Sequence, residues 1–259
     1  MTTSALVSTL VSTLRAAGCV FAEDEAELLI SAAPDDAELA RMVEQRVAGL
    51  PIEYVVGFAE FCGLRISLDP GVFVPRRRTE HLVAEALWLT RPGSVVVDLC
   101  CGSGALGVAV HAGEPAIDLY AADLEPAAVA CARRNVEPLG GQVSQGDLYA
   151  ALPPSLRGRI DVLLSNVPYV PSDEIRLLPT EARLHEPLVT LDGGSDGLDI
   201  LRRVSADAAH WLAPGGSILT ETSEKQASIA AATFTADGLA ARITTSDEFY
   251  ATVVIGTKE

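Results

Sequence analysis

The sequence predicts an α/β fold, in which a mainly parallel sheet is covered by helices, with a smaller helical module before it. Three observations support this. Beyond Pro75, short apolar runs alternate with helical segments, a pattern typical of three-layer α/β proteins. One of these runs, 95–99, leads directly into a glycine-rich turn. The first fifty residues instead carry apolar residues at helical spacing.

The N-terminal region, residues 1–50, is expected to form a helical domain. Leu6, Leu10, Val11 and Leu14 recur at the spacing of one helix face. Asp35 and Asp36, which follow a proline, predict the opening turn of a later helix.

Residues 51–75 are expected to form a β-hairpin linker. Short runs that favour extended structure lie at 53–56, 60–62 and 65–68, and Gly57 and Gly63 between them suit turns. Residues 76–259 then form the α/β domain, with strands expected at 95–99, 118–122, 143–145, 160–165, 217–220, 242–244 and 252–255.

Composition and charge exclude several classes of protein. The chain of 259 residues is 49% hydrophobic, which is ordinary for a folded protein, and its formal net charge of −16 disfavours binding to nucleic acid. The run Arg76 to Arg78 is interpreted as a solvated turn. No stretch reaches the ~20 apolar residues that a membrane span needs.

The cysteines and histidines indicate neither disulfides nor a metal site. The five cysteines contain no C-x-x-C pair, and their odd number favours reduced thiols in the cytoplasm. The four histidines lack metal-ligand spacing, so no metal is expected.

The glycine-rich turn predicts a cofactor site. Gly102, Gly104 and Gly107 spell G-x-G-x-x-G between a strand and a helix, and Asp123 follows Gly102 by 21 residues. This spacing suits either NAD or S-adenosylmethionine. The additional acid Asp98 favours S-adenosylmethionine, because it would repel a pyrophosphate.

A second motif, Asn166-Val167-Pro168-Tyr169, follows the apolar strand 160–165. The Asn166 side chain and the Val167 carbonyl provide two hydrogen-bond acceptors, which suit both N–H bonds of a primary amide or exocyclic amine. Tyr169 is expected to supply an apolar wall.

With these residues in view, the chain resembles the protein (glutamine-N5) methyltransferases that modify peptide chain release factors, the PrmC/HemK group. The resemblance spans nearly the whole chain and is carried by the stretches 46–57, 61–64, 69–76, 79–80 and 186–198, together with the two motifs above.

The resemblance implies a class I Rossmann-like methyltransferase domain with a seven-stranded sheet, and an N-terminal domain that recognises a substrate protein. It implies S-adenosylmethionine as cofactor, S-adenosylhomocysteine as product and a release factor as partner. Asn166 to Tyr169 would hold the glutamine amide. The resemblance places Cys100, Cys101, Gly102, Ser103, Gly104, Asp123, Leu148 and Asn166 at the cofactor site, and Asp98, Leu124 and Asp147 are expected to bind the cofactor as well.

Three departures from the family pattern stand out. The family usually has Asn-Pro-Pro-Tyr where this chain has Val167, and Pro-Arg-Pro-Asp-Thr-Glu where it has Arg77 and Arg78. Cys100 replaces the usual first glycine of the cofactor loop.

The departures leave alternatives open. The first is a related enzyme redirected to another peptide or a small molecule. An adenine-N6 methyltransferase would use a similar Asn166 loop, but the acidic charge disfavours it. An NAD-dependent oxidoreductase fits the glycines and leaves Asn166 to Tyr169 unexplained. A binding protein without catalysis is the last alternative.

Overall fold

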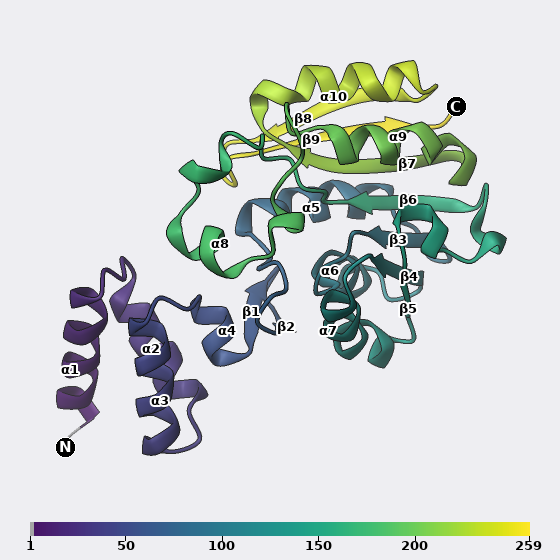
Figure 1. Ribbon diagram of the computed structural model, residues 1–259. Helices are drawn as coiled ribbons and strands as arrows, with labels where there is room; N and C mark the ends of the chain where they lie inside the picture. The colour runs from purple at the N-terminus through teal and green to yellow at the C-terminus, as the bar shows by residue number, and fades with distance from the viewer. Residues whose placement is uncertain (1–2) are drawn as a thin grey trace.

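The computed structural model describes residues 3–259 and shows a small helical lobe joined to a larger α/β lobe (Figure 1). The small lobe contains four helices: α1 Thr3–Ala16, α2 Ala22–Ala32, α3 Asp36–Val47 and α4 Ile52–Val56. It has a hydrophobic core of its own, in which Leu14, Ala26 and Leu29 are fully buried. Asp35 caps α3 by accepting a hydrogen bond of 2.8 Å from the Glu38 N–H, as the sequence predicts.

The extended run expected at 53–56 is wrong, because these residues form α4. Pro51 begins the helix, and its carbonyl oxygen accepts hydrogen bonds from the N–H groups of Tyr54 and Val55. Gly57, with φ of 79°, ends it and donates to the Glu53 carbonyl oxygen. Pro51 and the left-handed Gly57 therefore enclose a short helix of five residues.

The predicted hairpin follows α4. Strands β1 Phe58–Phe61 and β2 Leu64–Ser67 pair antiparallel, and Cys62 and Gly63 both take positive φ at the turn. Phe61 and Ile66 are buried in a hydrophobic cluster of the larger lobe, so the hairpin is packed against that lobe.

The larger lobe contains the expected mainly parallel sheet of seven strands. The strand order is β5-β4-β3-β6-β7-β9-β8, and β9 alone runs in the direction opposite to the other six strands. The strands are β3 Val95–Leu99, β4 Asp118–Asp123, β5 Gln142–Gln145, β6 Ile160–Ser165, β7 Leu212–Thr222, β8 Ala240–Ser246 and β9 Ala251–Thr257.

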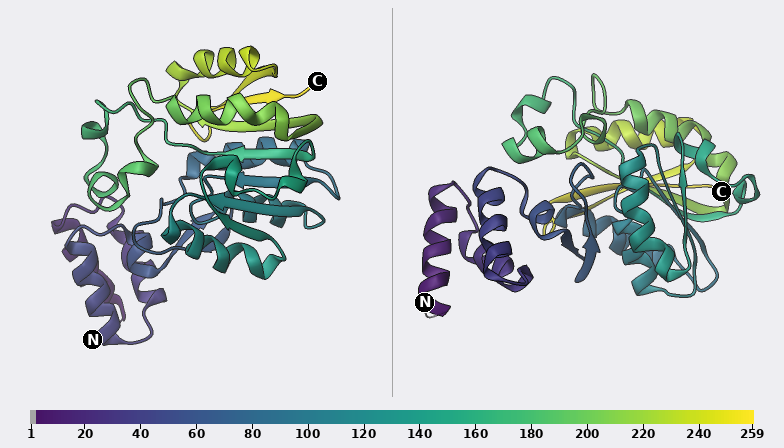
Figure 2. Two further views of the ribbon diagram at one scale, coloured as in Figure 1. Left: turned by 45° about the vertical axis from the view of Figure 1, so that its right-hand side comes forward. Right: turned by 60° about the horizontal axis from the view of Figure 1, so that its bottom comes forward.

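Helices cover both faces of this sheet (Figure 2). One face carries α5 Glu80–Leu89, α6 Ala105–Gly113 and α7 Pro126–Val136. The other carries α9 Asp199–Trp211 and α10 Glu224–Ala236. A short helix, α8 Thr180–His185, lies in the long connection between β6 and α9. No helix within residues 3–259 is long and apolar enough to cross a lipid bilayer.

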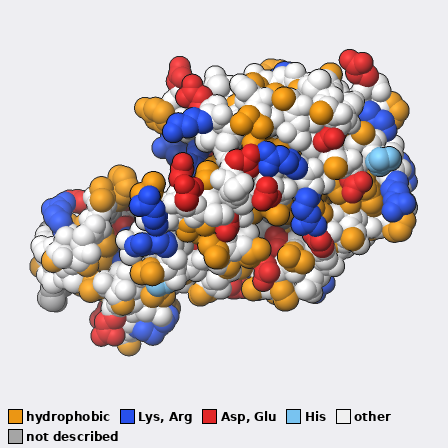
Figure 3. All heavy atoms as spheres, turned by 45° about the horizontal axis from the view of Figure 1, so that its top comes forward, with side chains coloured by type: hydrophobic (Ala, Val, Ile, Leu, Met, Phe, Trp, Pro, Cys, Tyr) orange, Lys and Arg blue, Asp and Glu red, His pale blue; other side chains and the backbone are white. Residues whose placement is uncertain are grey.

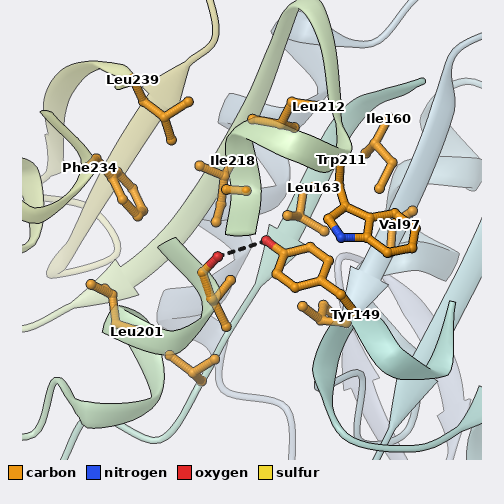
Figure 4. Close-up of a cluster of buried hydrophobic side chains, with 14 of the residues drawn as sticks. Val97, Tyr149, Ile160, Leu163, Leu201, Trp211, Leu212, Ile218, Phe234 and Leu239 are labelled. Atoms are coloured by element: carbon orange, nitrogen blue, oxygen red, sulfur yellow. Dashed lines mark hydrogen bonds between the residues drawn. The ribbon is translucent and has the colours of Figure 1, made fainter. Parts of the chain in front are cut away.

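Alternate residues of the central strands enter the two cores, because successive side chains of a strand point to opposite faces. Val96 packs under α5 and α6, whereas Val97 packs under α9. In the core below α9, the rings of Tyr149 and Trp211 stack with their centres 5.5 Å apart (Figure 4). The buried Tyr149 hydroxyl donates a hydrogen bond of 2.9 Å to the Val204 carbonyl oxygen.

The position of β3 determines where a ligand can bind. The chain passes from β3 to β4 and β5 on one side, and later to β6 and β7 on the other. In parallel sheets of this kind, a crevice opens at the carboxyl ends of the strands where the order reverses. The two motifs follow β3 and β6, which are neighbours at that point.

Candidate active site

A cavity of about 670 Å³ lies at the carboxyl ends of β3, β4 and β6. Such a volume is within the usual range for small-molecule sites. The structure brings most of the predicted site residues together along its wall: Cys100, Cys101, Gly102, Ser103, Asp123, Leu124, Asp147, Leu148, Asn166, Val167, Pro168 and Tyr169. Asp98 and Gly104 are not part of the wall.

Asp98 instead lies beneath the glycine loop. Its side chain is buried, and Oδ2 accepts a hydrogen bond of 2.9 Å from the Gly107 N–H at the start of α6. A Cβ atom at residue 107 would come within 3.3 Å of the Asp98 Cβ, so the close contact favours glycine there. Burial raises the pKa of Asp98 to about 7, against the Gly107 hydrogen bond and with a smaller contribution from Asp123.

The glycine loop bends through left-handed backbone conformations. Cys100, Gly102 and Gly104 have φ of 59°, 56° and 77°. A Cβ at Gly104 would lie 2.8 Å from the Val136 side chain, so α7 can pack closely only against glycine. Cys100 takes the same conformation with a side chain and packs on the core below α9. Burial raises the pKa of its thiol, which therefore stays protonated.

Asp123 at the end of β4 holds the other side of the loop. Its carboxylate accepts hydrogen bonds from the N–H groups of Gly102 at 2.8 Å and Glu125 at 2.9 Å. Burial raises its pKa. The carboxylate lies at the cavity wall, where its remaining acceptor capacity suits a ribose diol.

The adjoining wall comes from the segment after β5 and from α9. Leu148 has φ of 48° and begins a 3-10 helix, Leu148–Ala151. Asp147 forms an ion pair of 2.6 Å with Arg203, and Ile200 of α9 lines the same region.

Asn166 carries an unpartnered hydrogen-bonding group at the cavity wall. Its Oδ1 atom is buried, yet it accepts no hydrogen bond from any residue within 3–259. The Val167 carbonyl oxygen likewise has no partner in the described part of the chain. The Val167 side chain is buried in the core below α9. Because buried polar atoms normally have partners, the unpartnered Asn166 Oδ1 indicates a ligand that donates a hydrogen bond, and the Val167 carbonyl oxygen can accept a second one.

Tyr169 is fixed by polar contacts as well as apolar ones. Its hydroxyl donates a hydrogen bond of 2.6 Å to Glu221 at the end of β7, and the same carboxylate oxygen lies 2.9 Å from Arg78 Nε. The Arg78 guanidinium lies 5.6 Å from the centre of the tyrosine ring. Burial, together with the negative charge of Glu221, raises the pKa of Tyr169, which keeps the phenol protonated.

A glycine-rich turn, residues 192–197, packs against the backbone of the Asn166 motif. A Cβ at Gly197 would lie 2.2 Å from the Tyr169 carbonyl oxygen, and one at Gly193 would lie 2.7 Å from that of Pro168. Gln226 of α10 donates hydrogen bonds to the carbonyl oxygens of Tyr169 and Asp196, at 2.8 and 2.9 Å. The two segments are therefore in direct backbone contact.

The interpretation of Arg76 to Arg78 as a solvated turn is incomplete. Arg77 and Arg78 are exposed, but Arg76 lies 2.5 Å from Glu186 and Arg78 pairs with Glu221, and both glutamate side chains are almost fully buried. Each of these two arginines thus neutralises a buried carboxylate.

Sequence reasoning missed Glu221, Gln226 and Arg203. Glu221 carries the same signal that identified Asn166, a polar residue at the end of an apolar strand. Gln226 and Arg203 lie inside helices, and only the fold brings them to the site. Among the described residues, no group of histidine, cysteine, aspartate and glutamate side chains has the arrangement of a metal site.

Comparison with known proteins places this geometry in a family. Residues 63–186 match the family model described as Methyltransferase small domain. The chain is 41% identical over 191 residues to the release factor glutamine methyltransferase of Gloeobacter violaceus, covering 71% of this chain and 66% of that protein. It is 35% identical over 245 residues to the enzyme of the same name from Mycolicibacterium smegmatis, covering 88% and 86%.

One relative carries a different name. The 4-amino-L-phenylalanine/4-methylamino-L-phenylalanine methyltransferase of Streptomyces pristinaespiralis is 37% identical over 203 residues, covering 76% of this chain and 69% of that protein. Among solved structures, a methyltransferase from Pyrococcus furiosus matches with a TM-score of 0.56 at 18% identity, covering 76% of this chain and 89% of that one. That likeness supports the fold.

The expected S-adenosylmethionine-dependent methyltransferase is thereby confirmed in preference to an NAD-dependent oxidoreductase. The Asp123 carboxylate and the glycine loop at the cavity wall suit this cofactor. The chain belongs to the family of release factor glutamine methyltransferases.

Proposed function

We propose that this protein methylates the side-chain amide nitrogen of a glutamine in a peptide chain release factor. The observation that carries the proposal is the pair of unpartnered acceptors, Asn166 Oδ1 and the Val167 carbonyl oxygen, at the wall of the cofactor cavity. A primary amide has two N–H donors on one nitrogen, which matches two acceptors supplied by adjacent residues.

The two acceptors would both orient and activate the amide. S-adenosylmethionine supplies a methyl group bonded to a positively charged sulfur. Alignment of the nitrogen with that methyl group is the main contribution of the site, and good alignment is worth roughly 7–11 kcal/mol. As the nitrogen gains positive charge, its N–H bonds become stronger donors to Asn166 and Val167, which stabilises the transition state more than the ground state.

No side chain at this point is needed as a strong base. Tyr169 is the nearest titratable group of the motif, and its raised pKa keeps it protonated. Its hydrogen bond to Glu221 instead fixes the ring as a wall beside the amide.

The domain roles follow from the same proposal. The N-terminal domain expected at 1–50, to which the structure adds α4, recognises the substrate protein. The hairpin and the segment up to residue 75 form the linker, and 76–259 perform the transfer. We place the reaction in the cytoplasm, which is supported by the five unpaired cysteines of the chain.

The test uses labelled S-adenosylmethionine with a class I release factor and with a variant whose Gly-Gly-Gln glutamine is replaced by alanine. We expect label only on the glutamine form. The Asn166→Ala enzyme is the matched control, and calorimetry checks that it still binds the cofactor. Equal labelling of both release factors would refute the proposed target.

A second candidate is the transfer of methyl groups to the amine of a small amino acid. The relative named for 4-amino-L-phenylalanine supports it, as does Arg78 at the cavity wall. The Arg78 side chain is 49% exposed and forms an ion pair with only one carboxylate among residues 3–259, so its guanidinium can also bind a substrate carboxylate.

The two candidates differ in what Arg78 does. The second candidate would be supported by methylation of 4-amino-L-phenylalanine but not of the analogue that lacks the carboxyl group. The Arg78→Met variant should then lose this activity, and the Arg78→Lys variant should lose less of it. Activity on the release factor alone would reject it.

A further inference from the structure

The long connection between β6 and α9 forms one side of the cavity. Leu178, Pro179, Glu181 and Ala182 of this connection line the cavity, and the last two belong to α8. In Figures 1 and 2, α8 lies on the side of the larger lobe that faces the helical lobe. This wall is thus positioned between the two lobes.

Arg46 of α3 joins the wall to the helical lobe. Its Nε and Nη2 donate hydrogen bonds of 2.6 and 2.9 Å to Glu25 of α2, and its Nη1 donates to Glu181 Oε1 at 2.6 Å. Nη1 also donates to the Leu50 carbonyl oxygen at 2.9 Å. The Arg46 side chain is only 7% exposed, so water screens these contacts far less than it screens a surface pair.

The hydrogen bond from Arg46 to Glu181 is not needed to neutralise Arg46 within the helical lobe. The bidentate contact with Glu25 neutralises Arg46 within that lobe and satisfies the geometry that a guanidinium prefers. Glu181 is 135 residues away in the chain and adds a second carboxylate. Arg76 and Glu186 form a further ion pair at the other end of α8, so the helix is held at both ends. Figure 3 shows acidic and basic side chains next to one another where the two lobes meet.

We propose that Arg46 is a positioning residue that acts through Glu181, fixing the α8 wall of the cavity to the helical lobe so that a protein docked on that lobe is held in register with the methyl-transfer site. The inference rests on the proposed function, because it requires a substrate that contacts both lobes. The binding of a small-molecule substrate that fills only the cavity would not depend on how the helical lobe is positioned.

Glu181→Ala is the main test, because it removes the bridge and leaves the pair between Arg46 and Glu25 in place. Its matched control is Glu38→Ala, which removes an exposed ion pair with Arg41 on α3, the helix that carries Arg46. Hydrogen exchange is followed over residues 178–186, together with KM for the release factor, kcat and cofactor affinity. Glu181→Gln, which keeps a neutral acceptor for Arg46, tests for partial rescue.

In Glu181→Ala we expect exchange over residues 180–186 and KM for the release factor each to rise roughly tenfold, as the loss of a hydrogen bond between charged groups predicts. Cofactor affinity should change far less than KM, because Asp123 and the glycine loop are untouched. Glu181→Gln should recover part of the protection, and Glu38→Ala should resemble the wild type.

Unchanged exchange in Glu181→Ala would overturn the proposal, as would an unchanged KM in an enzyme that methylates the release factor. If the wild-type protein methylates no release factor, the proposed function fails. Exchange and cofactor affinity then still show whether Arg46 holds α8, because neither measurement needs the substrate.

Discussion

The two ends of the cavity are built in different ways. At the cofactor end, the loops after β3 and β4 supply backbone N–H groups and the Asp123 carboxylate, and the glycines and Cys100 bend within five residues of a strand. At the substrate end, three segments that are distant in the chain meet, and pairs such as Arg78 with Glu221 hold them together. The first end depends on local backbone geometry, and the second depends on long-range charge pairing.

The largest expected effect lies at the substrate end. Asn166→Ala removes one of the two acceptors for the reacting nitrogen, so we expect kcat to fall by about 10²–10³, the usual cost of deleting such a group. Cofactor affinity measured by calorimetry should fall much less. A parallel loss of cofactor affinity and kcat would show that the two ends do not act separately.

Asp98 provides a test of the cofactor end through pH. Its pKa of about 7 in the folded protein exceeds its ordinary value of 3.8, so the folded state keeps a proton that the unfolded state releases between these values. Its contribution to stability is therefore present at low pH and is lost as pH rises toward 7, by up to about 1.4 kcal/mol per pH unit.

Asp98→Asn removes this pH dependence and keeps an acceptor for the Gly107 N–H. In urea denaturation without cofactor, the variant should gain about 2 kcal/mol of unfolding free energy relative to wild type between pH 5 and 7. Parallel curves for the two proteins would contradict the raised pKa.

Asp123→Ala should weaken cofactor binding roughly tenfold, because it removes an acceptor for the cofactor and two contacts that shape the loop. Asp123→Asn keeps one acceptor, so its affinity for the cofactor is expected to lie between those of Asp123→Ala and the wild type. Calorimetric titration with S-adenosylmethionine measures both. An unchanged affinity would remove Asp123 from the cofactor site.

The smallest effect is expected at Cys100. Cys100→Gly relieves a left-handed backbone conformation but loses side-chain contacts with the core, so the unfolding free energy should change by less than about 1 kcal/mol. Thermal denaturation with and without cofactor checks this. A loss of several kcal/mol of unfolding free energy would mean that the packing of the Cys100 side chain, and not the backbone conformation of the loop, stabilises the cofactor end.

The difference between the two ends explains what the sequence could predict. Strands β3 and β6 were predicted with their observed bounds, since each is a short apolar run followed by a distinctive turn. The run 53–56 was misread, because β-branched residues concealed a helical turn set by Pro51 and Gly57. The pairs of Arg46 with Glu181 and of Arg78 with Glu221 join residues more than a hundred positions apart, and local pattern carries no signal for such contacts.

The contact between the 192–197 turn and the Asn166 motif limits how this enzyme can be given a new substrate. Gly193 and Gly197 lie against carbonyl oxygens with no room for a Cβ atom, so a side chain added at either position would displace the backbone that orients the reacting nitrogen. The neighbouring stretch 171–190 contains exposed positions, among them Leu177, Leu184 and Leu188. Mutant libraries aimed at altered specificity should therefore diversify these exposed positions, and leave unchanged both the turn and the paired Glu181 and Glu186.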